Sequence, residues 1–270
     1  MIVDLLRSFR VLFTSKRSRW EVAAVISTMA AIPVAEMLVL RTFSHLIVSG
    51  PSQFAEDPSA VLRSGAVFFL GFAATRAVHH LVRFVRVRVF HRRFDESSRK
   101  RTPSQEAWEW ALAFELSGVL VGLVQIVAFA GLFFYLDVVT GAANVVVSIA
   151  VLVFISWIYR RQLRLQREWV KMGSKPGTTS IGARVGSRIR SAEAGAILAT
   201  GGLAVMLVVM LSRVVSGDLS SADAIIFFIG LRILYGHVSA LSGGVMRFAR
   251  ASARRGVLVI AEDEDDDDGV

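Results

Sequence analysis

The sequence predicts an all-α polytopic membrane protein with six transmembrane helices and an N-terminal interfacial helix. Three observations predict this fold class. Hydrophobic residues make up 54% of the 270 residues and the mean hydropathy is +0.55, well above the usage of soluble domains. Six segments are long and apolar enough to cross about 30 Å of hydrocarbon. Lysine and arginine gather in alternate connections between these segments, which is the charge pattern of a membrane protein.

Residues 1–20 are expected to form an amphipathic interfacial segment. Ile2 to Phe13 are mainly apolar with Arg7 and Arg10 among them, which favours a helix lying in the membrane interface with its basic residues among the headgroups. A disordered basic tail is the alternative. The two arginines, and the lack of a small-residue cleavage site, argue against a signal peptide.

Residues 21–258 are expected to form the transmembrane domain. Each span is an apolar run of 18 residues or more, bounded by polar stretches or short turns. Glycines within the spans are candidates for close helix contacts, because they let two backbones approach. These glycines are Gly118 and Gly122, Gly201 and Gly202, and Gly243 and Gly244. The predicted spans are 22–47, 64–86, 110–136, 142–159, 192–212 and 222–246.

The distribution of charge predicts the orientation. Of the 31 lysines and arginines, 26 lie in 1–20, 83–107, 160–190 and 247–255, all on one side of a six-span chain. The five tryptophans lie at or near span ends on that same side. The positive-inside rule therefore predicts a multi-pass protein of the plasma (inner) membrane with both termini cytoplasmic. The net charge of +9 is attributed to contact with the lipid bilayer, and no nucleic-acid partner is expected.

Residues 259–270 are expected to be a disordered acidic tail. The stretch "AEDEDDDDGV" places seven carboxylates in the last nine residues, and a block of like charge cannot bury itself. A solvated tail is the simplest interpretation. Docking to a basic partner, or to the basic loops of this chain, is the alternative.

No residue pattern predicts catalysis. The stretch "GSKPGTTS" at 173–180 has the residue types of a phosphate-binding loop but not their order. Cysteine is absent, which excludes thiolate ligands and cysteine nucleophiles. The adjacent His79 and His80 point to different faces of a helix, so they cannot bind one metal ion together. The chain is therefore not expected to be an enzyme, and no cofactor or metal site is predicted.

The last third of the chain resembles the final two spans of the transmembrane domain of ABC exporters. The matching parts are the outer turn "SGDLSSADA", the span "IGLRILYGHVSALSG" and the following "FARASARRGVL", all within residues 188–258. The resemblance implies a six-helix exporter-like bundle in which two such domains, as a homodimer or heterodimer, form the translocation path. It also implies a separate nucleotide-binding subunit, because this chain ends where an ATPase domain would begin.

The regions that carry coupling helices in that family are short here, approximately 87–109 and 160–191. Residues 160–172 can extend the fourth span by three turns before glycines and a proline break the helix. Arg92, Arg93, Arg164 and Arg167 lie in these regions and are the candidate docking residues for a partner ATPase.

Four charged residues within the spans are the candidate site. Estimated depths make Arg76 and Glu115 the best matched pair, and Glu36 and Arg232 the second. Ionisable residues this deep usually face a bundle interior or a watery cavity with a partner. The four residues are therefore expected either to fix helix packing or to line a substrate cavity.

The predicted function is that of a membrane subunit of an ABC-type export system, working with a separate ATPase chain. The alternative is a membrane scaffold or accessory subunit that kept the fold and lost transport, which the short cytoplasmic loops favour. An integral-membrane enzyme acting on lipid is a third hypothesis, resting only on the paired charges. The sequence does not indicate a substrate.

Overall fold

The computed structural model describes residues 1–13, 15–95, 103–172 and 180–267. In these parts of the chain it is all-helical, which confirms the predicted class. Six of the helices are long and apolar enough to cross a membrane, so the chain is a multi-pass membrane protein. The helices are α1 (Ile2–Leu12), α2 (Lys16–Glu56), α3 (Pro58–Asp95), α4 (Pro103–Leu136), α5 (Val138–Met172), α6 (Ile181–Val215) and α7 (Ser221–Asp267).

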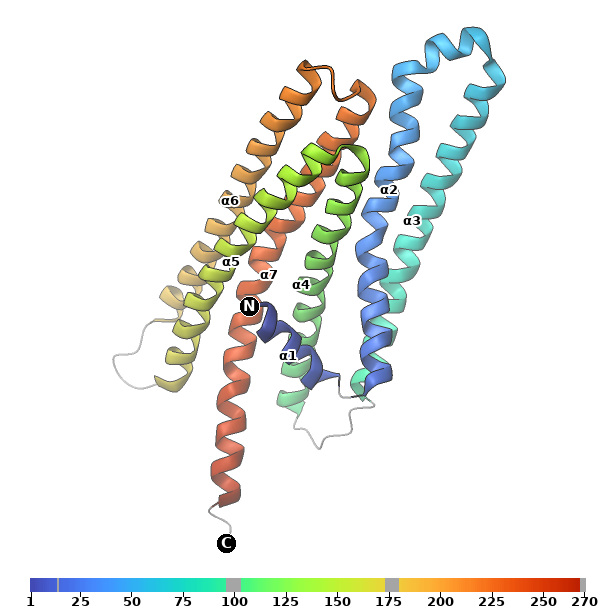
Figure 1. Ribbon diagram of the computed structural model, residues 1–270. Helices are drawn as coiled ribbons and strands as arrows, with labels where there is room; N and C mark the ends of the chain where they lie inside the picture. Colours follow the sequence, from blue (N-terminus) through green and yellow to red (C-terminus); the bar gives the residue numbers. More distant parts are fainter. Residues whose placement is uncertain (14, 96–102, 173–179, 268–270) are drawn as a thin grey trace.

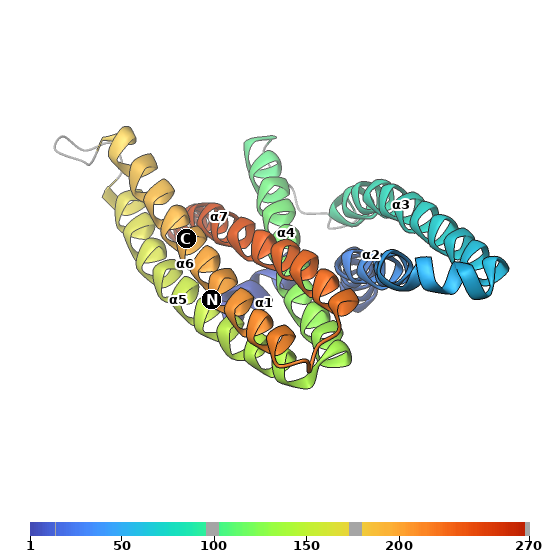
Figure 2. The ribbon, with the colours of Figure 1, turned by 90° about the horizontal axis from the view of Figure 1, so that it is seen from above.

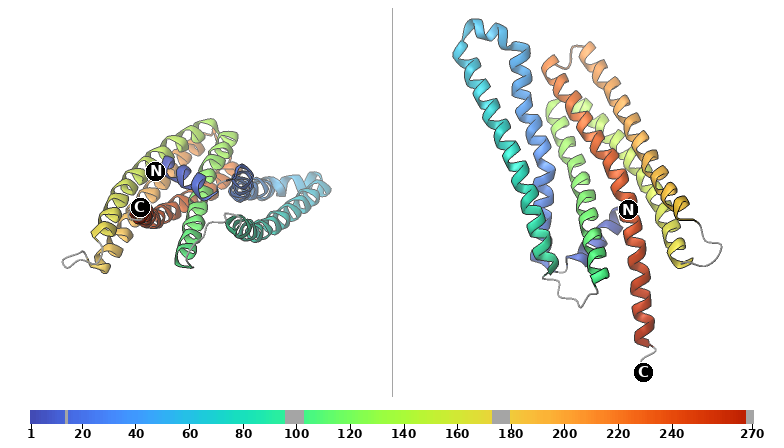
Figure 3. Two further views of the ribbon diagram at one scale, coloured as in Figure 1. Left: turned by 90° about the horizontal axis from the view of Figure 1, so that it is seen from below. Right: turned by 180° about the vertical axis from the view of Figure 1, so that it is seen from behind.

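The six long helices run up and down, so the turns α2–α3, α4–α5 and α6–α7 all lie at one end (Figure 1). The other end carries the arginine-rich starts and ends of α2, α3, α5 and α6, and we call it the basic end. Helices α4 to α7 pack as one bundle, and α2 packs on α4 and α7. Helix α3 packs on α2 and lies at the outer edge (Figures 2 and 3). The α2–α3 hairpin therefore leans away from the main bundle.

Helix α5 shows how the bundle is held together. Its outward face is apolar, with Val146, Val153 and Trp157 more than half exposed. Its inward face carries buried polar side chains, including Asn144 and Gln162. In a membrane the apolar residues can face lipid, so helix association depends on close packing and on polar contacts between helices. The α5 sequence has the apolar and polar faces that a lipid-exposed bundle requires.

Helix α1 packs against the bundle. Leu5, Leu12 and Phe13 are buried, and the Phe13 ring meets Phe90 of α3 edge-on, with ring centroids 5.6 Å apart. The predicted N-terminal helix is confirmed. A second apolar group, which includes Val3 with 76% exposed, faces away from the protein. Such a helix suits a membrane surface on that side, and its interfacial location remains a prediction.

Two segments differ from the expected loops. The connection between the first two predicted spans, 22–47 and 64–86, is helical apart from a turn at Asp57. Helix α2 continues through Pro51 to Glu56, and α3 begins at Pro58. The acidic segment 259–270 is helical as far as Asp267, as a continuation of α7, rather than irregular; residues 268–270 lie outside the described part. No proline interrupts α7, so its regular hydrogen bonding can continue into the acidic residues. The predicted extension of the fourth span through 160–172 is confirmed by α5.

The prediction that glycines mark close contacts between helices is confirmed at some positions and not at others. A Cβ added at Gly202 would lie 2.7 Å from the Tyr235 ring of α7, whereas one at the adjacent Gly201 would meet nothing within 4 Å. Gly122 and Gly244 lie at helix contacts, with neighbouring side-chain atoms 3.4 and 3.2 Å from the added Cβ. Gly118 has no such neighbour. Adjacent glycines therefore differ in role according to the face of the helix that they occupy.

Replacing Gly202 with alanine is expected to destabilise the protein by about 1–3 kcal/mol, because the new methyl group overlaps the Tyr235 ring. The matched Gly201→Ala variant should be neutral or slightly stabilising, because alanine favours the helix and has room. Thermal unfolding in detergent compares the two. Equal melting temperatures for both variants would contradict the close α6–α7 packing.

Candidate functional site

Glu36 and Arg76 form an ion pair that joins α2 to α3. The Arg76 Nη1 lies 3.5 Å from the Glu36 Oε1, and the Glu36 side chain is 13% exposed against 52% for Arg76. The guanidinium also lies over the Phe72 ring at 5.2 Å from its centroid, within the range of cation–π attraction. A charged pair on two neighbouring helices is the usual arrangement for ionisable residues inside a membrane.

The predicted Arg76–Glu115 pair is wrong. Helix α3 reaches α4 near the basic end, where the Arg86 Nη2 donates to the Ser117 hydroxyl at 2.6 Å. That contact places Arg86 of α3 and Ser117 of α4 at about the same position along the bundle axis. Because α3 and α4 are antiparallel, Arg76 lies about 15 Å further along the axis than this contact, while Glu115 lies slightly beyond it in the other direction. The sequence-based depths underestimated this separation.

Glu115 pairs instead with Arg247, joining α4 to α7. The Arg247 Nε donates to the Glu115 Oε1 at 2.8 Å. Arg247 directly precedes the segment "FARASARRGVL" and was predicted to lie just beyond the sixth span, 222–246. The structure places it opposite Glu115, close enough for a charge-assisted hydrogen bond.

Arg232 lies on the exposed side of α7. Among the described residues none forms an ion pair with it, so the predicted Glu36–Arg232 pair is also wrong. The depth estimate was sound, because the Ser44 hydroxyl of α2 donates to the Ala222 carbonyl of α7 at 2.7 Å, and Glu36 and Arg232 lie 8 and 10 residues below that contact. The directions differ: Glu36 turns to α3, and Arg232 turns away from the bundle.

An open cavity of about 440 Å³ surrounds Arg232. It lies on a face of α7 that includes Phe228, Gly236, Ala240 and Arg247, all exposed. The spacing of these residues keeps them on one side of the helix. The residues that line the cavity are Phe228, Ile229, Arg232, Ile233, Gly236 and His237. This face combines small residues with two arginines.

At the end opposite the basic end, Arg41 and Asp223 join the α2–α3 hairpin to the main bundle. The Arg41 Nε donates to the Asp223 Oδ1 at 2.8 Å, and the side chains are 30% and 15% exposed. Arg41 Nη1 also lies 3.3 Å from the Tyr135 hydroxyl of α4. Asp223 in turn accepts a hydrogen bond from the Ser220 hydroxyl at 2.9 Å. These contacts connect α2, α4 and α7.

A second charged cluster at that end centres on Asp137, between α4 and α5. Its Oδ2 accepts from the Thr140 backbone N at 2.8 Å and from the Thr140 hydroxyl at 2.5 Å, which caps α5. Its Oδ1 accepts from Arg213 of α6 at 3.1 Å. Burial alone raises the pKa of Asp137, but the Thr140 hydrogen bonds and the Arg213 charge outweigh burial and hold this pKa below its usual value of 3.8.

A lowered pKa in the folded protein predicts a loss of stability in acid. The contribution of Asp137 should be complete above pH 3.8 and disappear as the pH falls below it towards the lowered pKa. Asp137→Asn should therefore be less stable than the wild type at neutral pH. This difference in stability should shrink as the pH falls below 3.8, the usual pKa of an aspartate. Melting temperatures of the wild type and of Asp137→Asn, recorded from pH 7 to pH 3, measure this difference in stability. A constant difference across that range would contradict the assignment.

The candidate docking residues do not form one patch. Arg164 and Arg167 are exposed on α5, and Arg92 is exposed on α3; the side chain of Arg93 lies outside the described part. The basic ends of α3 and α5 lie on opposite sides of α4 and α7 (Figures 1 and 2). A partner that contacts all of these residues would have to cover the whole basic end.

Sequence reasoning missed Asp137, Asp223 and Arg247. Two of these had a readable signal, because "SSAD" at 220–223 and "DVVT" at 137–140 are capping patterns directly before an apolar run. No such signal marked Arg247 as a partner of Glu115. Within the described residues the structure also brings together no group of three histidines, aspartates or glutamates able to hold a metal ion.

Comparison with known proteins does not assign the chain to a family. No family model matches the sequence, and no curated protein matches it. The likeness of residues 188–258 to ABC exporters therefore remains a resemblance. Function has to be inferred from the charged residues and from the arrangement of the helices.

Proposed function

We propose that this protein is the membrane subunit of an ABC-type export system that works with a separate ATPase chain. Arg232 is the observation that carries the proposal. It lies 10 residues along α7 from Ala222, or about 15 Å from the end opposite the basic end. That position is close to the middle of a bilayer about 30 Å thick.

An exposed arginine at this depth is costly if lipid surrounds it. Insertion scales give about 2.5–3.5 kcal/mol for an arginine at the helix centre, and simulations give more. Arg232 has no acidic partner among the described residues, and the cavity beside it is open. Water or another protein surface facing this side of α7 would lower that cost. A translocation path between two copies supplies both.

The leaning α2–α3 hairpin also supports a path shared between two subunits. Helix α3 diverges from α4 with increasing distance from the basic end (Figures 1 and 3), while α2 stays in contact with α7 through Ser44 and Arg41. Gly236 and Ala240 leave α7 without bulky side chains below Arg232, and a Cβ at Gly236 would meet nothing within 4 Å. A second copy facing this side would enclose a space with arginines on its wall. Such a space favours anionic or polar substrates.

The accessibility of α7 to water tests the path. The chain has no cysteine, so single cysteines report cleanly. Gly236→Cys and Ala240→Cys should react with a membrane-impermeant thiol reagent in reconstituted protein. Cysteines at Ile197 and Val208, which are 72% and 69% exposed on α6, should stay unreactive because lipid covers them. If the two α7 positions are equally unreactive, the scaffold hypothesis is favoured.

The energy source is tested by copurification. We expect a nucleotide-binding subunit to copurify at low salt and to hydrolyse ATP faster with this protein than without it. Arg164→Glu with Arg167→Glu should weaken the association, because charge reversal repels a complementary acidic surface. Arg63→Glu at the other end is the matched control. Recovery of other membrane proteins, but never an ATPase, would favour the accessory-subunit alternative.

A further inference from the structure

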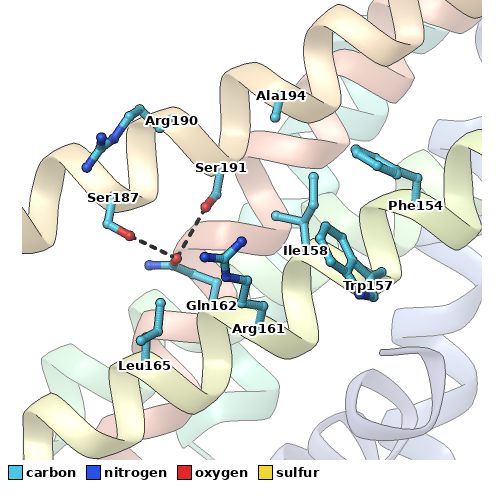
Figure 4. A pocket seen from close by; sticks show the side chains of 10 residues that line it. All are labelled: Phe154, Trp157, Ile158, Arg161, Gln162, Leu165, Ser187, Arg190, Ser191 and Ala194. Carbon is cyan, nitrogen blue, oxygen red and sulfur yellow. Dashed lines mark hydrogen bonds between the residues drawn. The ribbon is translucent and has the colours of Figure 1, made fainter.

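We propose that a cavity between α5 and α6, near the basic end, binds the phosphate of an anionic phospholipid headgroup. The cavity has a volume of about 380 Å³ and is separate from the Arg232 cavity. Figure 4 shows Gln162 on α5 facing Ser187 and Ser191 on α6, with Arg161 beside Gln162; Arg190 of α6 also lines the cavity. This site is independent of the proposed transport function.

In the part of the chain that the structure describes, the positive charge of the cavity has no counter-charge. Arg161 and Arg190 both line it, no carboxylate does, and among the described residues neither arginine has an acidic partner. Arginines suit phosphate binding, because each guanidinium group can donate two parallel hydrogen bonds to phosphate oxygens. The cavity therefore favours an anion with several acceptor oxygens.

Gln162 shows that the cavity is a built polar site. The residue is 1% exposed. Its Oε1 accepts hydrogen bonds from the Ser191 hydroxyl at 3.2 Å and the Ser187 hydroxyl at 3.4 Å. These bonds orient the amide so that Nε2, which is buried, has no partner among the described residues. A buried donor without an acceptor is destabilising. A phosphate oxygen held by the two arginines would satisfy it.

The surroundings favour a lipid as the source of the phosphate. Trp157 and Phe154 line the same cavity on α5 and are 57% and 38% exposed. Tryptophan is enriched at the boundary between headgroups and acyl chains, and these rings present apolar surface to an acyl chain directly beside the arginines. Basic pockets between membrane helices on the cytoplasmic side are known lipid-headgroup sites. A free phosphate would make no use of the rings.

Retention of lipid by the purified protein tests the site. Full-length protein is extracted from vesicles of equal phosphatidylglycerol and phosphatidylcholine, and bound lipids are counted by native mass spectrometry. Phosphatidylglycerol should be retained preferentially. Arg161→Gln with Arg190→Gln should lower its affinity about tenfold or more, because hydrogen bonds to a charged phosphate are lost. Gln162→Glu, which replaces the free donor with a carboxylate and keeps the bonds to the serines, should act in the same direction.

A matched charge control separates this site from general attraction to anionic lipid. Arg160→Gln with Arg167→Gln removes the same two charges from exposed positions of α5 outside the cavity, and should leave retention unchanged. An equal loss in this control, or equal retention of the two lipids, would overturn the proposal. Inorganic phosphate that protects the protein from heat as well as phosphatidylglycerol does would overturn the lipid as the source. A bound protein chain in place of lipid would also overturn it.

Discussion

Replacing Asp223 with asparagine is expected to lower the melting temperature of the protein in detergent by about 5–10 °C. The substitution keeps the size of the side chain and removes its charge. Arg41, which is 30% exposed and lies 2.8 Å from the carboxylate, is then left charged and partly buried without its counter-charge. Breaking a fully buried pair costs about 3–5 kcal/mol and an exposed pair about 1 kcal/mol or less. This pair lies between these limits, so about 2–3 kcal/mol is expected.

The loss should be concentrated where α2 meets the rest of the protein. Arg41 connects α2 to Asp223 of α7 and to Tyr135 of α4, while α3 packs on α2. Weakening this link should increase amide exchange in the outer half of the α2–α3 hairpin more than in α5 or α6. The hairpin would then move more freely relative to the main bundle, which connects this prediction to the proposed path.

Two variants make the Asp223 prediction specific. Glu56→Gln removes a carboxylate from an exposed position at the same end of the molecule and should leave the melting temperature unchanged. Adding Arg41→Met to Asp223→Asn should recover part of the loss, because no unpaired charge then remains. If the two substitutions are additive in a double-mutant cycle, the ion pair does not stabilise the fold.

The helices were predictable because their signals are local. Apolar length and flanking charge indicated all six spans, and the extension over 160–172 followed from the polar helix-forming residues before Gly173. The acidic segment was expected to be irregular because charge repulsion was given more weight than the continuity of α7, which extends to Asp267. Helix caps at Asp137 and Asp223 also have local signals, and their ion-pair partners do not.

The ion pairs were not predictable because depth describes only one coordinate of a membrane helix. The rotation of the helix decides which way a side chain points. Glu36 and Arg232 are nearly level, and yet one turns to α3 and the other away from the bundle. The sequence of α3 gave no help with rotation, because its apolar residues do not mark one face of the helix. Large apolar residues such as Leu62, Phe69 and Leu81 are exposed. Packing between helices fixes rotation, and packing is not a local property.

The coupling between charged residues inside the membrane should follow the pairs seen in the structure. We expect double-mutant cycles to give about 1–3 kcal/mol for Glu36 with Arg76. A comparable value is expected for Glu115 with Arg247, whose Nε–Oε1 distance is 2.8 Å. Glu36→Gln alone should cost about 2–3 kcal/mol, because its partner Arg76 stays at membrane depth without a counter-charge. Reversible unfolding in mixed detergent measures these free energies.

The combination of Arg76 and Glu115 is the matched negative control. Each of these residues forms an ion pair in the structure, but with a different residue and not with the other. Their substitutions should be additive within about 0.5 kcal/mol, as expected for distant sites. Exchanging the charges of Glu36 and Arg76 should restore part of the stability lost in either single variant, whereas exchanging Arg76 and Glu115 should add the two losses. Coupling between Arg76 and Glu115 would mean that α3 lies against α4 at this depth. The hairpin would then be closed, and the open face beside Arg232 would be narrower than a shared path requires.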